Sequence, residues 1–159
     1  MNNLLKMINN TKTQLQQQEQ LVQNKLQQLD NYIECLLGNN ASSVQEIDEN
    51  VFPNEVCKDL TCANTALLKF KNQLSEEKQD VKDFSSEVCG AITSIANIKN
   101  SINNAQAKLI YAQNKCALNG DIINADKLAK ISFELNYQNH MFVKNASSNV
   151  YDLKQIIKE

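Results

Sequence analysis

The side chains with the most varied chemistry in this 159-residue chain belong to five cysteines, at Cys35, Cys57, Cys62, Cys89 and Cys116. A cysteine forms disulfides, binds metal ions as a thiolate, or packs as a small apolar side chain. A bond between Cys57 and Cys62 would close a small loop, and Cys35 with either is the other pairing. These three are the candidates for a disulfide. The alternative is five free thiols that are mostly buried.

The single histidine offers little for catalysis. His140 stands beside Met141 and Phe142, with no Asp or Glu next to it in sequence. A zinc site would need a fourth ligand beside three cysteines, and His140 should lie toward the middle of the predicted rod, away from the end where Cys35, Cys57 and Cys62 converge. The sequence also lacks a glycine-rich phosphate loop, a Gly-x-Ser-x-Gly elbow and a His-Glu-x-x-His helix. We therefore predict a protein that is not an enzyme and holds no metal ion and no cofactor.

Charge and composition exclude other classes of protein. All sixteen basic residues are Lys, none is Arg, and the net charge is −2. Nucleic-acid binding normally shows a basic stripe and Arg for bidentate contacts, so we expect no nucleic-acid partner. The apolar runs are only a few residues long, which predicts no transmembrane segment. Three Gly and one Pro are too few turn formers for a β-sandwich or a parallel α/β domain. The sequence therefore predicts an all-α fold.

The strongest pattern is a seven-residue repeat that begins at Leu67 and ends at Cys116. Steps of three and four residues meet apolar side chains throughout, except at Glu77. Such a repeat keeps one face of a helix against a partner helix. It predicts one continuous helix over about 64–117, about 80 Å long at 1.5 Å per residue. Asn119 and Gly120 then supply the turn that ends it.

Two further helices flank this one. A weaker repeat predicts a helix over about 3–37, with Thr11 and Gln18 as polar positions on its apolar face. An apolar face from Leu128 to Ile157 predicts a last helix over about 121–157. Residues 39–62 contain the only proline and are too long for a simple turn, so we interpret them as an appendage.

Together these elements predict an elongated antiparallel three-helix coiled-coil bundle over residues 1–159, with a small appendage between helices 1 and 2. The long second helix would be the spine that the other two cover. The alternative is a homo-oligomer in which the apolar faces pair between chains.

The layout resembles a known family. The Gln-Gln-Gln-Glu-Gln run at 16–20, the appendage at 39–62 and the Asn-Ala-Asp-Lys-Leu-Ala segment at 124–129 resemble minor pilins. Such pilins lie at the pilus tips of type IV secretion and conjugation systems. The resemblance implies pilus-tip assembly or adhesion, with an appendage exposed for contact. Phe52, Pro53 and Asn54 are then the candidate contact residues.

We therefore expect a structural component that binds other protein subunits of a larger assembly. It would be a secreted pilus-tip or adhesin-like subunit or, alternatively, a cytosolic coiled-coil adaptor or secretion chaperone. The first ten residues lack the apolar stretch of a signal peptide, which is expected for a cytosolic chain or for a mature secreted chain with an added Met. A disulfide among the loop cysteines would favour secretion or the cell surface, and free thiols would favour the cytoplasm.

Overall fold

The computed structural model describes residues 2–38, 46–76 and 81–158, and all the regular secondary structure within them is helical, with no strand. The α-helices are α1 (Asn2–Leu36), α2 (Phe52–Ser75), α3 (Ser85–Leu118) and α4 (Ile122–Lys158). A 3-10 turn, η1 (Val81–Phe84), leads into α3. The predicted all-α fold is confirmed. The first and last predicted helices agree with α1 and α4 to within one residue at each end.

The predicted helix over 64–117 is wrong, because the chain forms two helices there. α2 ends at Ser75, where the backbone N–H of Glu76 still bonds to the carbonyl of Asn72, and α3 begins only at Ser85. Between Leu74 and Val81 the sequence has no apolar residue, so a helix continued across it would bury nothing there. Glu77, the polar exception in the repeat, lies outside the described residues.

The predicted appendage is also wrong over 52–62, which form the first half of α2. Proline suits the first turn of a helix because its missing N–H has no partner there in any case. Pro53 stands at that place, and Phe52 before it is buried. A hydrogen bond before the helix stabilises its first turn, because the carbonyl of Asp48 accepts the N–H of Phe52 at 2.9 Å. Residues 39–45 of the expected appendage lie outside the described part of the chain.

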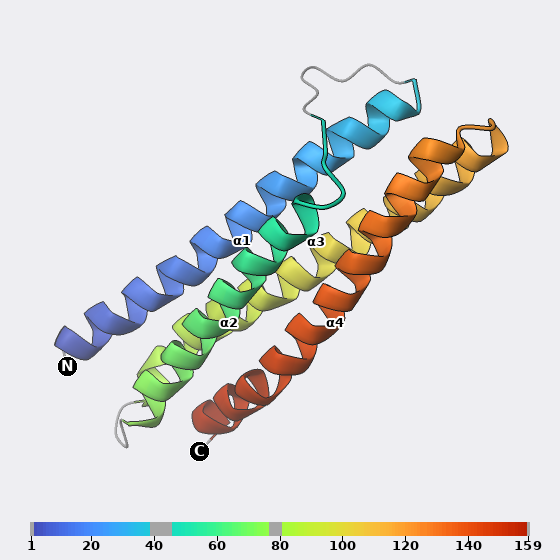
Figure 1. Cartoon of the computed structure of the whole chain (residues 1–159). Coiled ribbons are helices and arrows are strands. Elements are labelled where there is room, and N and C mark those ends of the chain that lie inside the picture. The colour runs from blue at the N-terminus through green and yellow to red at the C-terminus, as the bar shows by residue number, and fades with distance from the viewer. Residues whose placement is uncertain (1, 39–45, 77–80, 159) are drawn as a thin grey trace.

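The four helices form a bundle in which successive helices run in opposite directions (Figure 1). α1 packs against α2 and α3, and α4 packs against the same two helices. α1 and α4 therefore face each other across one diagonal of the bundle, and α2 and α3 across the other. The side-by-side pairs α1–α3 and α2–α4 are parallel. The predicted three-helix arrangement around one long spine is thus replaced by two hairpins, α1–α2 and α3–α4, packed side by side.

The apolar repeat nevertheless identifies the core correctly. Apart from Ala105, which is half-buried, its apolar members with described side chains are buried on both sides of the break: Leu67, Phe70, Leu74, Phe84, Val88, Ala91, Ile95, Ile98, Ile102, Leu109, Ala112 and Cys116. A heptad repeat states which face of a helix is buried but not which helix covers it. Gly120, at φ +79°, supplies the predicted turn after α3.

Buried polar contacts set how the helices are aligned. The Thr11 hydroxyl on α1 lies 3.0 Å from both the side-chain oxygen of Gln73 on α2 and the carbonyl of Met7, and donates to one of them at a time. Between α3 and α4, Asn139 donates to Asn103 at 2.9 Å. A slip by one residue would leave such groups unpaired in the core, which costs about 1–3 kcal/mol each.

Residues 46–51 close one end of the bundle. Ile47 is buried, and Lys127 of α4 lies 4.7 Å from the ring centre of Tyr32 on α1. The same ammonium lies 3.8 Å from Glu46 and 3.9 Å from Glu49. Burial alone would lower the pKa of Lys127, but the bond to Tyr32 and the two glutamates outweigh it and raise that pKa. The segment is thereby tied to both hairpins.

Candidate interaction surfaces

The cysteines predicted to pair are free thiols in this structure. Cys57 and Cys62 both lie on α2, and Cys35 lies near the end of α1, all three exposed. Five residues along a helix separate two side chains by about 7.5 Å along the axis and about 140° around it. A disulfide needs Cα atoms within about 7 Å, so Cys57 and Cys62 cannot bond while α2 is intact. The expectation of a small disulfide-closed loop depended on reading 57–62 as a loop, and it is wrong.

The candidate contact residues of the appendage are mostly inside the bundle. Phe52 and Pro53 are buried in the first turn of α2, and only Asn54 is exposed. The Asn54 side chain donates to the carbonyl of Asn50 at 3.3 Å, which extends the start of the helix. Phe52 and Pro53 therefore stabilise the fold, and a partner could not reach them without unfolding α2.

The titratable residues do not gather into a reactive cluster. His140 is exposed on α4, and the described residues hold no group of three or more His, Cys, Asp or Glu that could bind a metal ion. Cys116 is buried at the end of α3, where burial and then the nearby Asp121 raise the pKa of its thiol. A thiol held neutral in this way is a poor nucleophile.

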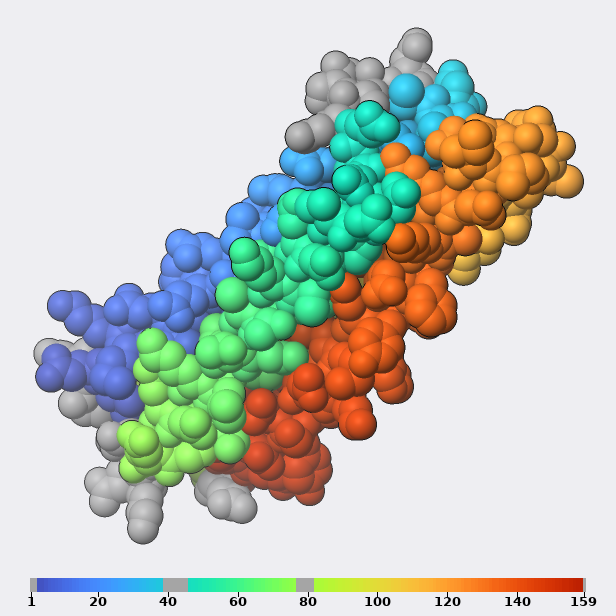
Figure 2. Space-filling model, in the orientation of Figure 1, coloured from blue at the N-terminus to red at the C-terminus, as the bar shows by residue number. Residues whose placement is uncertain are grey.

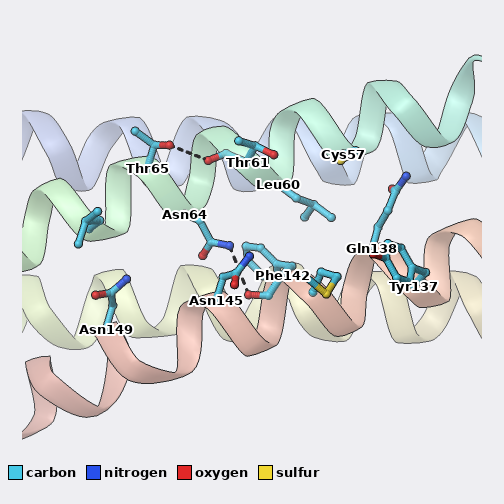
Figure 3. Close-up of a pocket in the computed structure, with 12 residues that line it drawn as sticks. Cys57, Leu60, Thr61, Asn64, Thr65, Tyr137, Gln138, Phe142, Asn145 and Asn149 are labelled. Carbon is cyan, nitrogen blue, oxygen red and sulfur yellow. Dashed lines mark hydrogen bonds between the residues drawn. The ribbon is translucent and has the colours of Figure 1, made fainter.

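A groove of about 470 Å³ runs between α2 and α4 (Figure 3). Its lining has no charged residue and combines apolar, amide and hydroxyl side chains. These are Cys57, Leu60, Thr61, Asn64, Thr65 and Leu68 of α2, and Tyr137, Gln138, Met141, Phe142, Asn145 and Asn149 of α4. From Cys57 to Leu68 the groove extends about 16 Å along α2.

The amides in the groove are only partly satisfied. Asn64 points from α2 toward α4 and donates to the Phe142 carbonyl at 3.3 Å (Figure 3). The side-chain oxygens of Asn64 and Gln138 are buried, and neither has a hydrogen-bond partner among the described residues. Most buried polar groups in proteins are paired, so these two acceptors leave hydrogen-bonding capacity unused beside the groove.

A pair of polar residues lies at each end of the groove. Lys71 of α2 lies 3.8 Å from Asp152 of α4, toward the carboxyl end of both helices. At the other end, Lys130 of α4 donates to the side chain of Asn50, just before α2. The two helices lie side by side across this face of the molecule (Figure 2). Charged groups are thus kept to the ends of the groove.

Aromatic side chains lie exposed on the outer face of α4, beside the groove. Phe133 is 72% exposed, Tyr137 58% and Tyr151 62%. Phe133 and Tyr151 are eighteen residues apart, which is five full turns, so they lie on one line along the helix. Exposed aromatics gathered on one face, which we call the α4 aromatic face, are more often a contact site than scattered apolar residues are.

A second exposed apolar group lies at the turn between α3 and α4. Leu118 is 82% exposed, Ile122 57% and Ile123 84%. This turn projects beyond the end of α1 (Figure 1). The sequence carried the signal for both surfaces, because these residues fall outside the apolar repeat. The repeat itself identifies only buried positions, so it does not predict these exposed surfaces.

None of the described helices has a stretch apolar and long enough to cross a membrane. Comparison of the chain with models of protein families, with curated proteins and with solved structures finds no match in any of the three.

Proposed function

We propose that this protein is a non-enzymatic structural component that works by protein–protein contact within a larger assembly. The observation that carries the proposal is the position of its exposed apolar side chains. Among the described residues, the six most exposed large apolar side chains, at 57–84%, lie on the α4 aromatic face and on the α3–α4 turn, and the other seven, at 43–56%, are distributed over α1, α2, α3 and Val51. Exposed apolar surface of this kind costs free energy in water and is recovered when a partner covers it.

The shape of the molecule suits such a role. Three of its helices have 34 to 37 residues, which corresponds to rods of about 50–55 Å. Their apolar faces are buried within one chain, so the bundle does not need a partner to form its core. The contact surfaces lie on the side and at one end of this rod, where they can join subunits without disturbing the core.

Two settings for this role differ in compartment. In the first, the protein is a secreted pilus-tip or adhesin-like subunit of a type IV secretion system, with contact made by the surfaces above in place of the expected appendage. In the second, it is a cytosolic coiled-coil adaptor or secretion chaperone. Five free thiols support the second setting. A thiol count by alkylation and mass spectrometry on protein from its native source separates the two, since a disulfide in that protein would favour the first.

Cross-linking in the native source tests the contact function. A lysine-reactive reagent is applied to intact cells, and cross-linked peptides of this chain with other protein chains are identified by mass spectrometry. We expect the intermolecular links to involve Lys130 and Lys144 of α4 and Lys115 near the α3–α4 turn. The lysines of α1 serve as the internal control, because the exposed large apolar residues of α1, Leu5, Met7 and Leu21, are each less than half exposed. Links spread evenly over both sets, or no links at all, would contradict the proposal.

A further inference from the structure

The α4 aromatic face has a layout that a second copy of the same chain can match. Phe133 and Tyr151 lie on one line of α4, about 27 Å apart, and the midpoint between them falls at Phe142. If a second α4 packs antiparallel about a two-fold axis at that level, residues whose numbers sum to 284 face each other. Phe133 of each copy then meets Tyr151 of the other, and Tyr137 meets Ser147. Two-fold interfaces are self-complementary in this way.

We propose that the protein forms a dimer in which the outer faces of α4 from two copies pack antiparallel, with Phe133 against Tyr151 twice. The inference rests on the proposed contact function and names the partner at this one surface. Aromatic pairs across an interface add about 0.5–1.5 kcal/mol each beyond the area they bury, which gives the arrangement its register.

The exposed area is enough for such a dimer. A phenylalanine or tyrosine side chain buries roughly 150–250 Å². At exposures of 72%, 58% and 62%, the three aromatics present roughly 300–500 Å² per copy, or roughly 600–1,000 Å² for two. Since about 65% of a homodimer interface is apolar, the whole interface would bury roughly 900–1,500 Å². That range overlaps the lower part of the roughly 1,200–2,000 Å² that specific complexes bury.

Charge near the axis gives the dimer a particular salt dependence. Lys144 is exposed two residues from the axis, so the two copies of Lys144 come close together, each facing His140 of the other chain. This like-charge contact opposes association, and salt screens it. In the same register Lys130 faces Lys154 and Asp126 faces Lys158, each twice, so a second repulsion and an attraction accompany the contact at the axis. Replacing Lys144 by alanine removes the repulsion at the axis, so it should tighten the dimer at low salt and remove the part of the salt dependence that comes from Lys144.

Sedimentation equilibrium on the whole purified chain tests the proposal. The wild-type protein is examined over about a 100-fold range of concentration, at low and high salt. We expect a monomer–dimer equilibrium that Phe133→Lys weakens by about tenfold or more, because the introduced lysine is buried against an aromatic ring. Ile110→Lys is the matched control, since Ile110 is 52% exposed but lies on α3, and it should leave the equilibrium unchanged. Circular dichroism confirms that each variant is folded.

A paired substitution tests the register directly. In Phe133→Lys/Tyr151→Glu the two introduced charges face each other with opposite sign, and in Phe133→Lys/Tyr151→Lys with like sign. The first variant should dimerise more strongly than the second, which a non-specific apolar association would not produce. A monomeric wild type, or equal affinities for the two double variants, would overturn the proposal. If the wild type is monomeric while native cross-links still involve α4, the contact function stands and the partner is another protein. If the wild type is monomeric and no native cross-links involve α4, the dimer proposal and the contact function both fail.

Discussion

Replacing Gly90 with alanine should stabilise the bundle, and the size of the effect follows from the α1–α3 contact. Gly90 lies inside α3, and its backbone is not in the left-handed region, so nothing in its conformation requires glycine. Glycine within a helix costs about 1 kcal/mol relative to alanine. A Cβ at Gly90 would lie 2.7 Å from Cε of Lys12 on α1 and 3.3 Å from its Nζ. The alanine therefore fits only if the end of the Lys12 side chain moves.

That movement is inexpensive because the obstructing atoms are the far end of a flexible side chain. A changed or strained torsion costs about 0.5 kcal/mol, against the gain of about 1 kcal/mol. The net expectation is a stabilisation of about 0.5 kcal/mol, which raises the melting temperature by about 1–2 °C for a chain of this length. In a Lys12→Ala background the gain from Gly90→Ala should rise toward the full 1 kcal/mol, since the obstruction is gone.

Urea unfolding followed by far-ultraviolet circular dichroism measures these differences. Gly120→Ala is the matched control, and it should lower the free energy of unfolding where Gly90→Ala raises it. Gly120 has φ +79° and open space around it, so an alanine there costs about 1 kcal/mol through the backbone alone. A Gly90→Ala variant less stable than wild type by more than about 0.5 kcal/mol would refute the reasoning, because it would mean that Lys12 is held rigidly over α3.

Two further predictions concern the stability of the fold, one from the Thr11–Gln73 hydrogen bond and one from the pKa values of Cys116 and Lys127. Thr11→Val should lower the free energy of unfolding by about 1–3 kcal/mol, because it keeps the side-chain volume but leaves the amide of Gln73 without its partner. Adding Gln73→Met should restore most of the loss, and a neutral single variant in urea unfolding would show that the hydrogen bond contributes nothing. The free energy of unfolding should also fall as pH rises above about 9. Folding raises the pKa of Cys116 above its ordinary value of 9.0 and that of Lys127 above 10.5. In both cases the unfolded chain releases its proton first, so stability is complete below the ordinary pKa and is lost as pH rises through the folded one. Cys116→Ala should remove the loss that begins near pH 9, as measured by urea unfolding at a series of pH values, and an unchanged profile would contradict this assignment.

Much of the fold was predictable from the sequence because burial follows the heptad spacing. The apolar repeat around Ile98 identified the buried face of α3, and Gly120 identified the turn into α4. Thr11 stood out as a polar position within an apolar face. Its partner could not be found in the same way, since Gln73 is off the repeat of its own helix and becomes buried only when α2 packs beside α1.

The candidate surfaces were harder to predict. Phe133 lies off the apolar face of its helix in the sequence, but whether another helix also covers that side of α4 depends on how the four helices pack. The groove between α2 and α4 likewise exists only because Asn64 and Phe142, which are 78 residues apart, come together. The cysteine prediction failed for a related reason, since Cys57 and Cys62 were assigned to a loop when they lie on a helix.

By itself, the sequence determined that the chain is all-α, which faces of its helices are buried and where the turn at Gly120 lies. Those are local properties, set by side-chain spacing and by glycine. Only the tertiary structure decided that the apolar repeat is divided between two helices and that four helices share one core. Helix ends and helix partners depend on the total area buried by the whole chain. A run without apolar residues after Leu74 separates two helices once a neighbouring hairpin offers each of them a surface to cover.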